Sequence, residues 1–446
     1  MSEPLLYRST RGLAPGAGIG EAIAAGLAPD GGLYVPEALP RLDPADFDPR
    51  GSLADTATRL LRPFFVGHAL AAELPAICAE AFAFDAPLRP LGQHPGVAVL
   101  ELFHGPSAAF KDFGARFLAS CFRRLRKPDE PPLTILVATS GDTGAAVAAA
   151  FHRQPGVEVV ILYPDGLVSP RQAHQLGCFG DNVRALRVAG RFDDCQRMVK
   201  AALNDAGLQA RRPLSSANSI SLGRLLPQMA YYAHASLQWQ REHGRPLNFV
   251  VPTGNLGNAL ACVWVREMGL PVGEIELACN ANQTLPDYFG GAAYAARPAV
   301  ATLANAMDVG APSNFERLRW TFPYDADLRQ QLSSHSVDDA TICATVLRHA
   351  TRGEVFCPHT ATAMHRFEQR DRQADWAVVA TAHPAKFESV IEPLIGRTVP
   401  VPPALAAMLD RPAQAEPLEA TDAALKAWLL GEGAEVCGPE QARRLG

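Results

Sequence analysis

The sequence has no stretch of 18 consecutive apolar residues in its 446 positions, so no membrane-spanning helix is expected. It also lacks a basic tract, because 41 Lys and Arg residues against 46 Asp and Glu residues give a formal net charge of −5 at pH 7. A mildly acidic chain without a basic patch is not expected to bind nucleic acid. An anionic ligand must therefore be bound by local geometry rather than by bulk charge.

The nine cysteines form no C-x-x-C pair, and their number is odd. This pattern argues against a disulfide framework and against a zinc site, so no metal is expected. The segment Met1–Arg11 has no basic stretch followed by an apolar run, so no secretory signal is expected either. These absences together predict a cytoplasmic protein in a reducing compartment.

Short β-branched runs alternate with longer amphipathic segments from Val97 onward, and hydrophobic residues make up 48% of the chain. We expect strands at Val97–Phe103, Leu133–Ala138, Val157–Tyr163, Val183–Val188, Asn248–Val251, Glu274–Cys279 and Trp376–Ala380, with helices between them. This alternation is typical of βαβ units and predicts an α/β fold with mainly parallel sheets. We expect three parts: an N-terminal domain over 1–95, an α/β region over 96–403 and a helical tail over 404–446.

Lys111 is the first candidate for chemistry. It follows a predicted strand and a Gly-Pro turn, and lies one turn into a predicted helix, Ala108–Leu125, between Phe110 and Phe113. Burial among aromatic rings lowers the pKa of a lysine and makes its amine a usable nucleophile and base. The alternative is an ordinary surface lysine beside core phenylalanines.

A second candidate follows the predicted strand Leu133–Ala138, where the chain enters a helix. Its residues are Ser140, Gly141, Asp142 and Thr143. The amides at such a helix start point toward bound anions, and the helix dipole favours negative charge there. The alternative is a well-capped helix, since Ser, Asp and Thr are good N-caps.

Two more strand-to-helix junctions carry candidates. After Asn248–Val251 come Gly254, Asn255, Leu256, Gly257 and Asn258, whose two glycines let backbone amides approach a phosphate. A tight turn is the alternative, and no G-K-[ST] follows to make a Walker loop. After Trp376–Ala380 comes Thr381, which offers a hydroxyl to a ring nitrogen or simply caps the helix.

Taken together, these segments resemble the long-chain threonine synthases. The resemblance extends from Leu27–Tyr34 to Thr381–Phe387, includes Ser216–Ile220 and Asn305–Val309, and is most specific over residues 102–117 and 138–151. It implies the type II fold of pyridoxal 5'-phosphate (PLP) enzymes, in which two open twisted lobes hold the cofactor in a cleft. It also implies a lyase that converts O-phospho-L-homoserine and water into L-threonine and phosphate, the last step of threonine biosynthesis.

By this resemblance, Lys111 forms the Schiff base with PLP, the segment Gly254–Asn258 binds the cofactor phosphate, and Thr381 faces the pyridine nitrogen. Some members carry Phe and Asp where this chain has Leu256 and Asn258. The contacts of that loop are expected to come largely from backbone amides, so we expect the segment Gly254–Asn258 to bind the phosphate despite both differences.

For the substrate, analogy with enzymes of this fold assigns its carboxylate to Ser140–Thr143. The candidates for holding the leaving phosphate are His104, Ser107, Asn218 and Lys386. We expect a small-molecule substrate, no nucleic acid or membrane partner, and a monomer or homodimer. Two alternatives stay open: a related PLP phospho-lyase acting on another phosphorylated amino acid, and a catalytically silent binding protein with this fold.

Overall fold

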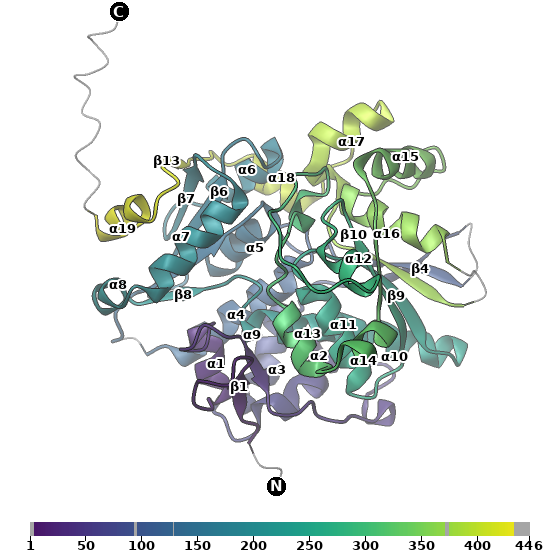
Figure 1. Ribbon diagram of the computed structural model, residues 1–446, viewed down its shortest axis with the longest axis horizontal. Helices are drawn as coiled ribbons and strands as arrows, with labels where there is room; N and C mark the ends of the chain where they lie inside the picture. Colours follow the sequence, from purple (N-terminus) through teal and green to yellow (C-terminus); the bar gives the residue numbers. More distant parts are fainter. Residues whose placement is uncertain (1–3, 93–95, 128, 371–373, 432–446) are drawn as a thin grey trace, which may run out of the picture.

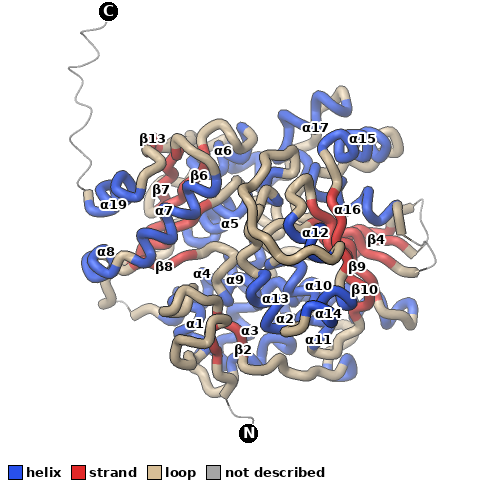
Figure 2. The backbone as a smooth tube through the Cα atoms, in the orientation of Figure 1, coloured by secondary structure: helices blue, strands red, loops and turns tan. Residues whose placement is uncertain are grey.

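Two open β-sheets, each flanked by helices, form two lobes (Figure 1). The computed structural model describes residues 4–92, 96–127, 129–370 and 374–431. Figure 2 shows most strands gathered in two separate groups with helices and loops around them, while β1 and β2 form a small sheet near the N-terminus. This arrangement confirms the predicted fold class, an α/β protein with two mainly parallel lobes and additional N-terminal elements.

The smaller sheet has the strand order β13-β7-β6-β5-β8, and all its pairings are parallel. Its strands are β5 (Leu133–Ala138), β6 (Val157–Pro164), β7 (Val183–Val188), β8 (Leu214–Ser216) and β13 (Glu416–Leu418). Its helices are α5 (Asp142–Phe151), α6 (Pro170–Gly177), α7 (Phe192–Asn204), α8 (Ala206–Arg211), α18 (Pro403–Leu409) and α19 (Asp422–Leu430). Every residue of β5 is buried, as expected for a central parallel strand.

The larger sheet has the order β11-β10-β9-β12-β4-β3, and only the β3–β4 pairing within it is antiparallel. Its strands are β3 (Leu88–Pro90), β4 (Val97–Glu101), β9 (Leu247–Pro252), β10 (Val272–Cys279), β11 (Ser333–Ser336) and β12 (Trp376–Ala380). The helices of this part are α4 (Lys111–Leu125), α9 (Leu222–Leu225), α10 (Met229–His243), α11 (Gly257–Glu267), α12 (Thr284–Phe289), α13 (Phe315–Thr321), α14 (Asp325–Gln331), α15 (Asp339–Ala350), α16 (Pro358–Glu368) and α17 (Glu388–Ile395).

The N-terminal elements pack against the larger lobe. They are β1 (Tyr7–Ser9), α1 (Ile19–Ala25), β2 (Tyr34–Pro36), α2 (Leu53–Leu61) and α3 (Leu70–Ala81). Helix α3 packs on α4, and α2 packs on α10. The buried guanidinium of Arg317 donates to the carbonyls of Tyr34 (3.0 Å) and Ile220 (2.7 Å), and so joins these elements to the segment before α9.

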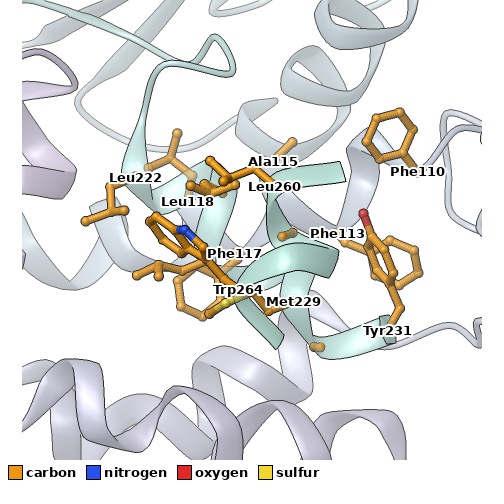
Figure 3. Close-up of a cluster of buried hydrophobic side chains, with 14 of the residues drawn as sticks. Phe110, Phe113, Ala115, Phe117, Leu118, Leu222, Met229, Tyr231, Leu260 and Trp264 are labelled. Carbon is orange, nitrogen blue, oxygen red and sulfur yellow. The ribbon is translucent and has the colours of Figure 1, made fainter. Parts of the chain in front are cut away.

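Buried side chains from α4, α9, α10 and α11 pack together in one cluster (Figure 3). Phe113 contacts Tyr231 with ring centroids 5.3 Å apart, and Met229 and Trp264 belong to the same core. Burying side chains of this size stabilises the fold by about 1.5–3 kcal/mol each. The first turn of α4 is therefore packed against α10 through Phe113.

Three predictions about secondary structure were wrong. The helix predicted over Leu222–Arg241 is interrupted by a 3-10 turn, Leu226–Gln228, because Pro227 has no N–H to continue the α-helical ladder. Helix α4 begins at Lys111 rather than Ala108, because Ala108 has a left-handed φ of 55° and Ala109 bridges to Ala382.

The C-terminal tail is not wholly helical, because β13 extends the smaller sheet by pairing with β7 at its free edge. Residues 432–446 of the predicted tail lie outside the described residues.

Within the described residues, no helix is long and apolar enough to cross a membrane. No group of three His, Cys, Asp or Glu side chains in those ranges has the arrangement of a metal site.

Candidate active site

All four candidate segments follow the carboxyl ends of parallel strands. Strands β9, β12 and β4 are neighbours in the larger sheet, and they lead into the segments that carry Gly254, Thr381 and Lys111. Strand β5 of the smaller sheet leads into Ser140. Ligands of open α/β sheets bind at the carboxyl ends of the strands, and here two sheets bring those ends together.

The segments meet in two connected pockets. The inner pocket is lined by Lys111, the segment Gly254–Asn258 and Thr381, together with Arg224 and His359. The outer pocket is lined by Lys111, Ser140, Asp142, Thr143, Asn218 and one face of α7. Lys111, Asp142, Ser219, Asn255 and Ala306 line both pockets. The lysine amine therefore lies where the two pockets join.

Backbone contacts to the segment after β12 fix the position of Lys111. The N–H of Phe110 donates to the carbonyl of Thr381 at 2.8 Å, and Ala109 forms a β-bridge with Ala382. The Nζ atom lies 4.3 Å from the ring centroid of Phe110. This connection holds Lys111 and Thr381, which are far apart in the sequence, on the wall of one pocket.

Burial lowers the pKa of Lys111 to about 8, from the ordinary 10.5. The positive charge of Arg224 contributes to this lowering, while the carboxylate of Asp142 opposes it. Arg224 is itself buried, and burial lowers the pKa of its guanidinium to about 10. At neutral pH a usable fraction of the Lys111 amine is therefore uncharged and nucleophilic.

A pH dependence follows from this shift. In the protein without cofactor, the fraction of neutral Lys111 amine should rise with a midpoint near pH 8, because the folded protein disfavours the protonated form. The rate at which the protein captures added PLP should rise over the same range, as measured by stopped-flow absorbance. A midpoint near the ordinary value of 10.5 would contradict the effect of burial.

The segment Gly254–Asn258 forms a backbone cradle at the start of α11. Leu256 adopts a left-handed φ of 63° and caps the helix, so the first amides of α11 are free of intrahelical partners. A Cβ atom at Gly254 would lie 2.7 Å from the Cα atom of Met307, so only glycine fits there. The loop thus leaves backbone N–H groups available to an anion.

Asn258 adds a side-chain donor to this cradle. The hydroxyls of Tyr231 and Tyr232 both donate to its Oδ1 atom, whereas its buried Nδ2 atom has no partner among the described residues. A buried donor without an acceptor costs about 1–3 kcal/mol. An anion in the inner pocket would satisfy it, so the residues present fit a cofactor phosphate.

The helix start after β5 is built around Thr139 and Gly141. The Oγ1 atom of Thr139 accepts from the N–H groups of Gly141 and Gly144, both at 3.0 Å. Gly141 has a φ of 128°, which favours glycine, and its Cβ would collide with Gln172. The N-terminus of α5 therefore faces the outer pocket at Ser140 and Thr143.

Asp142 forms a buried ion pair behind this helix start. Its Oδ1 atom lies 2.9 Å from Nζ of Lys386, and it also accepts from Nε2 of Gln172 at 3.0 Å. Burial pushes the pKa of Asp142 upward, but the charge of Lys386 and these hydrogen bonds outweigh burial and leave the pKa below its ordinary value. The ionised carboxylate is thus neutralised locally by Lys386.

The four residues predicted to hold the leaving phosphate are not brought together. Asn218 lines the outer pocket, with its amide bonded to the carbonyl of Ala138 at 2.6 Å. His104 is exposed, bonds to Glu101 at 2.9 Å, and lies outside both pockets. Ser107 and Lys386 are fully buried, and Nζ of Lys386 donates to the Ser107 carbonyl at 2.6 Å. Lys386 is therefore the counter-ion of Asp142 and does not line either pocket.

Two residues that line the inner pocket, Arg224 and His359, were not predicted from the sequence. Arg224 lines the inner pocket, and an arginine within the apolar run Leu222–Leu226 is a signal that could have found it. His359 is buried, burial lowers its pKa to about 4, and its Nε2 atom accepts from the N–H of Ala306 at 3.1 Å. It thereby positions the loop that contributes Ala306 to both pockets. No short-range pattern marks His359.

The fold and site define a PLP-dependent enzyme of type II. The family model described as "Pyridoxal-phosphate dependent enzyme" matches residues 84–384, and those described as "Threonine synthase N terminus" and "Threonine synthase, C-terminal" match residues 6–82 and 360–428. The chain belongs to the threonine synthase family, and it is a PLP-dependent lyase.

Individual relatives agree with this assignment. The chain is 37% identical to the threonine synthase of Serratia marcescens over 414 residues, which cover 92% of this chain and 96% of the relative. The crystal structure of threonine synthase from Escherichia coli superimposes with a TM-score of 0.90 at 35% identity, covering 96% of this chain and 100% of that one. A PLP-bound threonine synthase from Brucella melitensis gives a TM-score of 0.86 at 32% identity, with 96% and 100% covered.

Proposed function

We propose that this enzyme converts O-phospho-L-homoserine and water into L-threonine and phosphate, as the last step of threonine biosynthesis. The observation that carries the proposal is that Lys111, the cradle Gly254–Asn258 and Thr381 line one pocket, and that Lys111 also lines a second pocket beside it. No feature of the site favours another phosphorylated amino acid. A silent binding protein would have no need of a reactive amine beside an anion cradle.

The residues of the inner pocket would hold PLP, which supplies an electron sink for reactions at the substrate carbons. Lys111 would bind its aldehyde carbon covalently, and the amides of Gly254–Asn258 with the Nδ2 atom of Asn258 would bind its phosphate. Arg224, also on this wall, adds positive charge near the amine of Lys111.

Lys111 then acts as the general base and acid. Lys111 lines both pockets, and its lowered pKa would suit its amine to move a proton between the Cα and Cβ atoms of a bound substrate. The phosphate leaves from Cγ with the electron pair of the C–O bond, and water adds at Cβ. We assign the substrate carboxylate to the N-terminus of α5 at Ser140–Thr143, where the dipole and free amides favour it.

The assignment is tested by supplying O-phospho-L-homoserine to the purified protein with PLP and measuring L-threonine and inorganic phosphate. The two products should appear in equal amounts. Failure to form threonine from this substrate would overturn the proposed function.

The free state of the eight described cysteines, seven of them buried, supports a reducing compartment such as the cytoplasm.

Thr381 is proposed to meet the ring nitrogen with a neutral hydroxyl, which would leave that nitrogen mostly unprotonated. The change Thr381→Asp places a carboxylate there and favours protonation. It should raise transamination relative to threonine formation by roughly an order of magnitude, which corresponds to about 1.4 kcal/mol. The measurement is the ratio of 2-oxo acid to threonine. The matched control Thr381→Ser keeps the hydroxyl, and an unchanged ratio in Thr381→Asp would contradict the proposed role.

A further inference from the structure

One face of α7 forms a wall of the outer pocket. Phe192, Gln196, Val199, Lys200 and Leu203 all line it. Residues four apart lie on the same side of a helix, so Gln196 and Lys200 present an amide and an ammonium side by side. Neither residue is among the substrate contacts assigned so far.

Lys200 differs from the two lysines that form ion pairs. Lys386 is paired with Asp142, and Lys426 with Asp205 at 2.6 Å. In the part of the chain that the structure describes, Lys200 makes no ion pair or hydrogen bond through its ammonium. Lys200 is exposed to solvent at the rim of this pocket, so its ammonium is accessible to an anionic ligand that enters the pocket.

The rest of the outer pocket combines apolar side chains, such as Phe192, Leu203 and Val309, with groups that can bind a phosphate. Its carboxylate, Asp142, is neutralised by Lys386, so the uncompensated charge on the walls is positive. The other polar side chains are hydroxyls and amides: Thr139, Ser140, Thr143, Gln196, Ser216, Asn218, Ser219, Asn255 and Ser313. These groups donate hydrogen bonds without adding negative charge.

We propose that Lys200, with Gln196 one turn before it, binds the phosphate group of the substrate. This inference rests on the proposed function. The substrate has three polar ends, and two of them are assigned: the amine to Lys111 and the carboxylate to Ser140–Thr143. The phosphate dianion occupies the remaining wall, where the ammonium of Lys200 stabilises the charge that grows on the phosphate as the C–O bond breaks. The electron pair of that bond leaves with the phosphate, and Lys200 transfers no proton.

The test compares Lys200→Gln with Lys200→Arg and Lys127→Gln in the PLP-loaded enzyme. Lys127 is exposed beyond the end of α4 and lines neither pocket, so its change alters the net charge equally without touching the site. For Lys200→Gln, kcat/KM for O-phospho-L-homoserine should fall by about 10- to 100-fold, the usual effect of losing a charge-assisted hydrogen bond. Lys200→Arg should keep most of the activity, and Lys127→Gln all of it.

Two further measurements separate phosphate binding from a structural role. Inorganic phosphate should inhibit Lys200→Gln more weakly, by a factor similar to the loss in kcat/KM. L-Homoserine, which has no phosphate group, should bind the variant and the wild type equally, as followed by the change in cofactor absorbance.

The outcomes distinguish this inference from the proposed function. If the wild-type enzyme makes no threonine from O-phospho-L-homoserine, the proposed function itself fails. If the wild type is active but Lys200→Gln keeps its kcat/KM and its inhibition by phosphate, only the role of Lys200 is overturned. An equal loss of L-homoserine binding in Lys200→Gln would also overturn it, because that loss would be independent of the phosphate.

Discussion

Replacing Lys111 with alanine is expected to abolish threonine formation and the Schiff-base absorbance of the bound cofactor. The variant loses the covalent link to PLP and the base that moves the substrate proton. Loss of a general acid–base group alone slows a reaction by about 10²- to 10⁴-fold. Because the same amine would do both tasks, the loss should exceed that range. The measurements are the visible spectrum after addition of PLP and the rate of threonine formation.

A suitable control is Lys127→Ala, which removes an exposed lysine outside both pockets and should leave spectrum and rate unchanged. The fold of Lys111→Ala should persist, because Phe113 and Tyr231, rather than the lysine side chain, anchor the first turn of α4. Thermal unfolding checks that point. If Lys111→Ala still shows the Schiff-base absorbance and turns over at the normal rate, another residue carries the cofactor.

The second large effect should come from Lys386→Met. This change removes the buried partner of Asp142 and leaves its carboxylate without a counter-ion at 4% exposure. Breaking a buried ion pair by removing one partner typically costs about 3–5 kcal/mol. The free energy of unfolding should fall by that amount near neutral pH, as measured by urea denaturation monitored by fluorescence.

The pH dependence of this loss identifies its cause. In the wild type, the pKa of Asp142 is below its ordinary value, so its ionised form contributes stability above that value. In Lys386→Met, burial acts without the opposing lysine, and the folded-state pKa of Asp142 should rise above its ordinary 3.8. The loss of unfolding free energy in Lys386→Met should therefore shrink as the pH falls, because Asp142 then takes up a proton in both the folded and the unfolded protein.

Two variants control this experiment. Lys426→Met breaks the exposed pair with Asp205 and should cost no more than about 1 kcal/mol. Adding Asp142→Asn to Lys386→Met removes the stranded charge and should restore part of the stability. A loss in Lys386→Met no larger than that in Lys426→Met would contradict the importance of the buried pair.

The sequence predicted the parallel lobes well because buried parallel strands leave a strong signal. Strands β5, β7 and β12 have the predicted bounds, since their runs of β-branched and other apolar residues end at clear turns. The four junctions after β4, β5, β9 and β12 were predicted for the same reason. Gly, Ser, Thr and Asn directly after a buried strand are recognisable without knowledge of the tertiary structure.

The parts that were missed depend on contacts between distant segments. The start of α4 is set by backbone hydrogen bonds to the segment after β12, about 270 residues further along the chain: the N–H of Phe110 donates to the carbonyl of Thr381, and the N–H of His383 donates to the carbonyl of Ala108. Lys386 was predicted to hold the leaving phosphate but is paired with Asp142 in the structure. The sequence could not show this pairing, because Asp142 follows a strand of the other sheet. A local pattern shows that a charge is present, but it does not show which charge lies opposite.

The most direct test is to reduce the PLP-loaded enzyme with borohydride and to locate the modified lysine by peptide mapping. Borohydride fixes the cofactor permanently to the nitrogen that holds it. The chain has only five lysines, at positions 111, 127, 200, 386 and 426, so the assignment has few alternatives. The account predicts a single modified peptide that contains Lys111. Modification of Lys200 or Lys386 instead, with Lys111 unmodified, would contradict it.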